Sequence, residues 1–290
     1  MKKVFCKMAL AAVLALTTLF TGCKAPSSGG GGGNSGGESA YNPPEKNIPL
    51  TLEAIADGQI TFSNLDRITN LKYRINDGDV TAATDTGISL PAGDKISLFA
   101  EGTSNVNRPN QCFTINCSSD CYVYGNVMSL LTADYQTATE ITKNYAFAWL
   151  FHDNSHIKNH TEKDLVLPAI TLAESCYYGM FYGCTSLTQA PVLPATTLAE
   201  FCYCYMFHGC TSLTQAPALP ATTLAGYCYA RMFSGCTSLN KVTCLATDLS
   251  AADCTDAWLY GVASSGTFTK ASGTDWSSGD IPSGWTIQNK

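Results

Sequence analysis

Three histidines spaced four residues apart are the first candidates for chemistry in this chain. The segment HDNSHIKNHTEKD places three imidazoles near three carboxylates: His152, His156, His160, Asp153, Glu162 and Asp164. On a helix, this spacing would align the imidazoles on one face, where they could hold a metal ion. The segment is poor in helix-forming residues, however, so we favour a solvated polar loop that binds no metal.

Cysteine is the second reactive residue type, with 14 among 290 residues. Two sets recur every 26 residues: Cys176, Cys202, Cys228 and Cys254, and then Cys184, Cys210 and Cys236. Exported proteins usually pair their cysteines, but stacked equivalent residues about 4.8 Å apart carry parallel side chains. We therefore expect small buried apolar side chains in both sets, because the spacing does not suit zinc either. Cys117 and Cys121 flank a short turn, where a disulfide and two free thiols are both compatible with the sequence.

Familiar catalytic patterns are missing from the sequence, which contains no HExxH, no GxSxG and no phosphate-binding loop. Glu174 and Glu200 occupy equivalent places in two repeats, but Gly226 follows in the third. A solvated edge explains this pair more simply than a carboxylate pair for glycan hydrolysis. We expect neither enzyme activity nor a cofactor.

The residues above lie in or beside a unit of 26 residues that is written three times, from Leu167, Leu193 and Leu219. A period of this length predicts a stacked repeat array. Within a unit, apolar residues recur every fourth position: Leu172, Cys176, Met180 and Cys184. This spacing predicts a short helix, followed by a corner and an extended segment that the prolines keep from being helical. Stacking should place Phe181, Phe207 and Phe233 in one apolar column.

Three positions of the unit change most between copies. They hold Tyr178, Cys204 and Ala230; Gly179, Tyr205 and Arg231; and Tyr182, His208 and Ser234. A core position would not accept such changes in volume, so these positions should lie on the surface. Tyr and Arg are typical contact residues, which makes a binding face of Tyr178, Tyr182, Tyr205, His208 and Arg231. Neutral surface variation is the alternative.

The N-terminal residues predict export and attachment to a membrane. Residues 1–22 combine three lysines with a short apolar run, as in a signal peptide, and end in LFTGC, which resembles a bacterial lipobox with Phe20 as a departure. Cys23 is then the lipidation site. Residues 23–47 are rich in Gly and Ser and predict a flexible tether with a standoff of about 25–30 Å. Loss of the three lysines would take the net charge from −6 to about −9, which argues against binding of nucleic acid.

Two folded regions should follow the tether. Residues 48–140 show alternating apolar positions between turn signals, which predicts a small immunoglobulin-like β-sandwich. Residues 141–265 should form the repeat array, and residues 266–290 a C-terminal cap. The expected fold class is therefore a mixed α/β repeat protein, a solenoid of the leucine-rich-repeat type preceded by a β-sandwich.

The repeat resembles that of BspA-like leucine-rich-repeat surface lipoproteins. The resemblance rests on Phe181-x-x-Cys184-x-x-Leu187 followed by Val192-Leu193-Pro194, and on the segments KNHTEKDLVLPA and GTFTK…IPSGWT. It covers roughly residues 110–290, although the Asn ladder of standard leucine-rich repeats is absent. It implies a surface-exposed lipoprotein of the bacterial cell envelope, in a family with some members proposed to bind host matrix.

Three functions fit these features. The first is a protein anchored at the outer membrane or cell surface that binds a host-matrix protein or a surface glycan, in adhesion or host interaction. The second is an envelope-associated enzyme acting on glycans, with the repeats as its binding module. The third is a purely structural envelope protein. The first accounts best for the repeats and the missing catalytic pattern.

Overall fold

A computed structural model describes residues 43–276 and 279–290 of the chain. The expected signal peptide, the lipidation site Cys23 and most of the expected tether lie outside the described residues. None of the described helices is long and apolar enough to cross a membrane. The residues from Ala40 to Lys290 form one compact unit.

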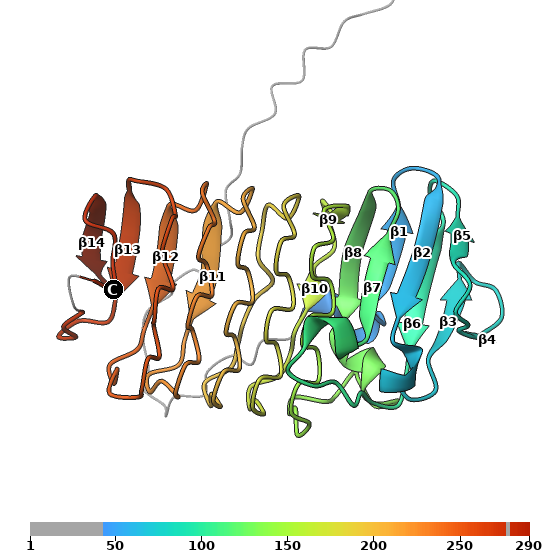
Figure 1. Ribbon diagram of the computed structural model, residues 1–290, viewed down its shortest axis with the longest axis horizontal. Helices are drawn as coiled ribbons and strands as arrows, with labels where there is room; N and C mark the ends of the chain where they lie inside the picture. Colours follow the sequence, from blue (N-terminus) through green and yellow to red (C-terminus); the bar gives the residue numbers. More distant parts are fainter. Residues whose placement is uncertain (1–42, 277–278) are drawn as a thin grey trace, which may run out of the picture. The chain divides into compact units, whose positions relative to one another are not determined.

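Strands and turns build the described part of the chain, in which the only helices are four short 3₁₀ turns (Figure 1). The 3₁₀ turns are η1 (Pro44–Asn47), η2 (Leu65–Arg67), η3 (Pro109–Gln111) and η4 (Val127–Leu130). The strands of the first half are β1 (Thr51–Ala54), β2 (Gly58–Ser63), β3 (Lys72–Ile75), β4 (Thr81–Ala82), β5 (Ile88–Leu90), β6 (Lys95–Phe99), β7 (Thr114–Cys117) and β8 (Cys121–Asn126). Those of the repeat region are β9 (Ile157–Asn159), β10 (Leu165–Val166), β11 (Gln215–Leu219), β12 (Lys241–Cys244), β13 (Gly266–Lys270) and β14 (Trp285–Asn289).

The first half contains two antiparallel arrangements, and its strands form where the sequence alternates between apolar and polar residues. One sheet runs in the order β8-β1-β6-β3-β4, and a second has the order β5-β2-β7. Ile96 and Leu98 of β6 and Ile115 of β7 are fully buried, which confirms the predicted inward positions of these strands.

The larger sheet crosses the domain boundary expected at residue 140. Strand β8 pairs with β1 on one side and, in parallel, with β9 and β10 of the repeat region on the other. The side chain of Asn126, which is fully buried at the end of β8, donates to the carbonyls of Lys46 and Tyr135. The last residues of the expected tether are therefore packed onto the sheet as η1.

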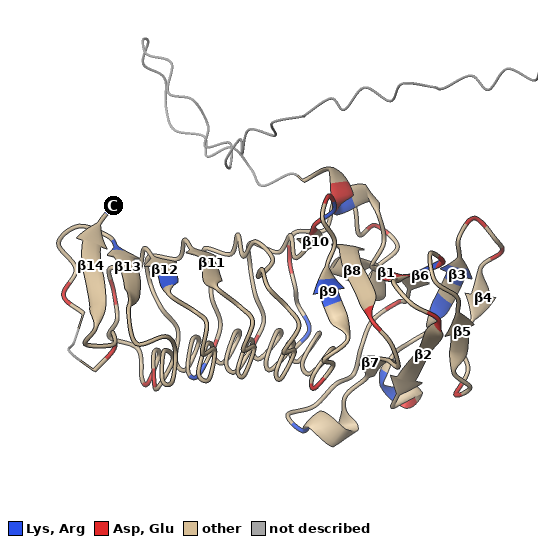
Figure 2. Ribbon diagram, turned by 90° about the horizontal axis from the view of Figure 1, so that it is seen from above, with Lys and Arg blue, Asp and Glu red and all other residues tan. Residues whose placement is uncertain are grey.

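The repeats stack coil upon coil in sequence order (Figures 1 and 2). In the segment 175–184, every second amide donates to the next coil, as Tyr177 N–H does to Cys202 O at 3.0 Å and Gly179 N–H to Cys204 O at 2.9 Å. The amides between them donate three residues back within the coil, as Tyr178 N–H does to Ser175 O at 3.1 Å. The backbone groups of this segment are thus satisfied without an α-helix.

The predicted mixed α/β solenoid with a separate immunoglobulin-like sandwich is therefore wrong. The described residues contain no α-helix, and the strands belong to several sheets, one of which spans both expected regions. The interval of four residues comes from successive turns, each closed by a residue with positive φ. Ser175, Gly179 and Gly183 have φ values of 54°, 57° and 70°, and the equivalent residues of the other coils behave alike. A helix would keep φ negative throughout.

Two aromatic columns run through the stack. Phe181 and Phe207 are parallel at a ring separation of 5.4 Å, and Phe207 and Phe233 at 5.6 Å, which confirms the predicted phenylalanine column. A second column, not predicted from the sequence, consists of Phe147, Tyr177, Tyr203, Tyr229, Trp258 and Trp276. Both columns bury ring faces against the next coil, so each coil depends on its neighbours for its core.

The extended side of the stack becomes a regular sheet only in its second half. Strands β11, β12, β13 and β14 pair in parallel, so the expected cap continues the sheet. Earlier coils carry prolines such as Pro191, which lack the N–H that a ladder needs. There the side chain of Asn159 bridges two coils, accepting from the backbone N–H of Thr188 and Gln189 and donating to Gln189 O.

Candidate functional site

The five side chains predicted to form a binding face lie together on the turn side of the stack. Tyr182 stacks on His208 at 4.6 Å between ring centroids and lies 6.3 Å from Tyr205. Tyr205 also lies 5.7 Å from Tyr178, and the Arg231 guanidinium lies over its ring at 5.7 Å. We call these five residues the aromatic face. It draws on three successive coils, so no single repeat contains it.

The turn geometry explains why these side chains point outward. Buried pairs such as Cys176 and Tyr177 alternate with pairs that face away from the core. Tyr205 and Arg231 have φ values of 59° and 54°, and the same place is held by a residue of positive φ in every coil. Arg231 is exposed, and its Nε lies 3.5 Å from a carboxylate oxygen of Asp256 in the next coil. The face thus ends in an ion pair at the surface.

Three other variable residues lie inside the molecule, contrary to the expectation that all these positions are exposed. Cys204, Ala230 and Ser234 are 3 %, 4 % and 6 % exposed. All three are small, and the larger Tyr178 at the equivalent of Cys204 is only half-buried. The position therefore accepts a small inward side chain or a large one that reaches the surface.

The sequence did not point to Trp149, which lies against the aromatic face. Its ring is 5.3 Å from that of Tyr178 and 5.6 Å from that of Tyr182. With Tyr205, these residues line a pocket of about 350 Å³. Trp149 is the equivalent of Gly179 one coil earlier, but a four-residue insertion shifts it from the 26-residue register. Alignment by turns, not by fixed period, would have found it.

Electrostatics keep the imidazole of this face neutral. Burial, and then the positive charge of Arg231, lower the pKa of His208 below its ordinary value of 6.5. The Nδ1 atom of His208 is buried without a hydrogen-bond partner among the described residues. Burial likewise raises the pKa of the Tyr178 hydroxyl. Near neutral pH, the aromatic face therefore presents uncharged rings with one guanidinium at its edge.

The histidine cluster is dispersed in the structure. His152 contacts the ring of Trp149, His156 Nδ1 lies 3.1 Å from a carboxylate oxygen of Asp120, and His160 packs edge-on against Tyr122 and Tyr124. Strand β9 lies between the second and third histidines and breaks the helical spacing. Among residues 43–276 and 279–290, no group of three metal-binding side chains occurs.

The described cysteines are all free and all buried. In the column of Cys184, Cys210 and Cys236, each thiol donates to the carbonyl of a phenylalanine one coil earlier, at 3.0–3.1 Å. Burial raises the pKa of these thiols, so they stay protonated. The thiols thus combine small apolar volume with a hydrogen bond to a carbonyl inside the stack.

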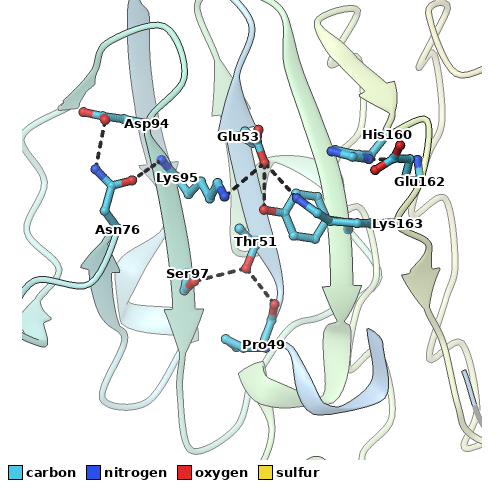
Figure 3. Close-up of polar contacts among 11 residues, drawn as sticks. Pro49, Thr51, Glu53, Asn76, Asp94, Lys95, Ser97, His160, Glu162 and Lys163 are labelled. Carbon is cyan, nitrogen blue, oxygen red and sulfur yellow. Dashed lines mark hydrogen bonds and ion pairs between the residues drawn. The ribbon is translucent and has the colours of Figure 1, made fainter. Parts of the chain in front are cut away.

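A polar cluster on the large sheet was also missed from the sequence (Figure 3). The Glu53 carboxylate accepts from the Tyr124 hydroxyl at 2.9 Å and from Lys163 Nζ at 3.2 Å, and Lys95 Nζ lies 3.9 Å away. Burial opposes ionisation of Glu53, but Tyr124 and the two lysines outweigh it and lower the pKa of this carboxyl. Because Lys163 follows β9, the cluster ties the repeat region to the sheet.

The remaining acidic candidates do not converge. The Glu174 carboxylate accepts from the Asn144 side chain at 3.1 Å, and Glu200 is exposed. Comparison with protein-family models, curated proteins and solved structures finds no match to this chain. The function is therefore argued from the residues themselves.

Proposed function

We propose that this chain is a lipid-anchored bacterial surface protein that binds a protein or a glycan through the aromatic face of its stacked repeats, in adhesion or host interaction. One observation carries the proposal: the side chains that vary between copies meet in one surface, with ring centroids 4.6–6.3 Å apart. Neutral variation would have no reason to assemble three tyrosines, a histidine and an arginine side by side.

The scaffold beneath the face suits binding. Tyr182, Tyr205 and Arg231 stand on backbone that is hydrogen-bonded to the neighbouring coil, so little freedom is lost when a partner docks. Tyrosine and arginine are also the residue types that most often dominate interface energetics. The face therefore offers a preformed patch that needs no rearrangement.

The N-terminal sequence supports a location for this activity. A signal peptide over residues 1–22, lipidation at Cys23 and a tether that begins there would hold the repeats away from a membrane of the bacterial envelope. The resemblance of the repeat to BspA-like surface lipoproteins supports display at the outer membrane or cell surface. The acidic chain gives no support for nucleic acid as a partner.

The proposal predicts that Tyr182→Ala, Tyr205→Ala and Arg231→Ala, made together, weaken partner binding at least about tenfold. All three side chains reach the surface, so the melting temperature should stay within about 2 °C of the parent. The measurement is a pull-down with the purified full chain in detergent against immobilised matrix proteins and envelope glycans, followed by titration of the partner captured.

A matched triple variant on the extended side of the stack serves as the control: Gln189→Ala, Val192→Ala and Gln215→Ala, all at exposed positions. It should bind like the parent. Equal binding by the parent and the aromatic-face variant would remove this face as the binding surface, and capture of no partner at all would contradict the proposed role.

A further inference from the structure

The pocket at the start of the aromatic face exists because of one glycine. Gly179 occupies the place held by Tyr205 and Arg231 in later coils, and those residues adopt the same positive φ without being glycine. A Cβ added to Gly179 would lie 2.6 Å from Cε3 and Cζ3 of Trp149. The missing side chain therefore lets the indole settle directly on the backbone, and Tyr178 and Tyr182 lean against it.

The pocket combines ring faces with a few polar groups. Besides Trp149 and the three tyrosines, its lining includes Asn110 from η3 and the exposed Asp153. Its volume of about 350 Å³ lies at the lower end of the range for small-molecule sites, about 300–1,000 Å³. The indole N–H of Trp149, a residue only 9 % exposed, has no hydrogen-bond partner among the described residues. A ligand that brings an oxygen to this N–H would relieve an unpaired donor.

These groups match the chemistry of a sugar ring. The face of an aromatic ring is electron-rich and attracts the weakly positive C–H groups on one side of a pyranose, while amide and carboxylate groups accept or donate to its hydroxyls. Asp153 in the lining disfavours an anionic ligand, and no lysine or arginine lines the pocket. An aliphatic ligand would leave Asn110 and the indole N–H unpaired.

We propose that this pocket binds a neutral sugar unit of a glycan, held between Trp149, Tyr178 and Tyr182 and stacked on Tyr205. The inference rests on the proposed function, since it names the ligand class of the same face. The rest of the glycan follows the face across successive coils, over His208 and towards Arg231. There the ion pair between Arg231 and Asp256 balances its own charge, as a neutral chain requires.

The test is binding of the purified full chain to an array of neutral and acidic glycans, followed by calorimetric titration of the best soluble oligosaccharide. We expect neutral glycans to bind, Tyr182→Ala to weaken binding at least about tenfold and Trp149→Phe to weaken it several-fold. Trp149→Phe keeps an aromatic ring in the packing but removes the N–H. Both variants should keep the parent melting temperature.

Tyr260→Ala is the matched control, because Tyr260 holds the place of Tyr182 three coils later and is 76 % exposed. It should bind glycan like the parent. Absence of any neutral glycan binding, a preference for acidic glycans, or unchanged titration with Tyr182→Ala would overturn the inference. Capture of a matrix protein that the triple variant abolishes, without neutral glycan binding, would overturn it while leaving the proposed function in place.

Discussion

Phe207→Asp is expected to unfold the stack. Phe207 is fully buried, with the rings of Phe181 and Phe233 parallel to it at 5.4 and 5.6 Å. Loss of the ring alone costs about 3–5 kcal/mol, and a carboxylate buried without a partner adds several more. The sum is comparable with the total stability of a typical domain, about 5–15 kcal/mol. A circular-dichroism melt of the purified full chain measures the effect.

Phe207→Leu separates the loss of ring stacking from the introduction of charge. It keeps an apolar side chain in the column and should cost only about 1–2 kcal/mol, with a cooperative transition retained. If Phe207→Asp melted within a few degrees of the parent, the phenylalanine column would not be the core of the stack.

Gly125→Ala should give the second large loss, at the junction between the sheet and the repeats. Gly125 has a φ of 85°, and a Cβ there would lie 2.2 Å from Pro49 O and 2.9 Å from Pro49 C. These are backbone atoms of the segment that pairs with Asn126, so they cannot rotate away. Positive φ and the clash together should cost about 3 kcal/mol or more, measured by urea unfolding.

Gly93→Ala provides a control with the same backbone conformation. Gly93 also has a φ of 85°, but a Cβ there would meet nothing within 4 Å. It should cost only the conformational penalty, about 1 kcal/mol. Equal losses in the two variants would show that Pro49 does not approach β8 as closely as the structure has it.

Much of the packing could be predicted from the sequence, because equivalent residues of a repeat must meet when the coils stack. The phenylalanine column and the burial of Cys176 and Cys184 follow from the 26-residue period alone. The strands of the first half follow from alternation. The clustering of Tyr182, Tyr205 and Arg231 follows from comparing copies, since variable positions that coincide in the unit coincide in space.

The helix was wrongly predicted because apolar residues every fourth position fit both a helix and a series of turns. A hint lies in Gly183, Gly209 and Gly235, which recur at a place of positive φ. Tyr205 and Arg231 take positive φ without being glycine, however, so local preference could not identify that turn. Contacts with the neighbouring coil impose it, and the sequence of one coil does not record them.

The pocket depended on a relation that the period conceals. Trp149 meets Gly179 only because the insertion before Leu167 is accommodated in a loop while the turn segments remain stacked. The polar cluster of Glu53, Tyr124 and Lys163 likewise joins residues far apart in the chain. Neither grouping has a local signature.

The central claim is that successive coils stack peptide upon peptide, which places Tyr182, Tyr205 and His208 in one surface. Scalar couplings across hydrogen bonds, measured by NMR on deuterated full chain, test it most directly. The structure predicts couplings from the Tyr177 nitrogen to the Cys202 carbonyl carbon and from the Gly179 nitrogen to that of Cys204. Couplings from these nitrogens to Ala173 and Ser175, four residues back, would show a helix and contradict the stacked arrangement.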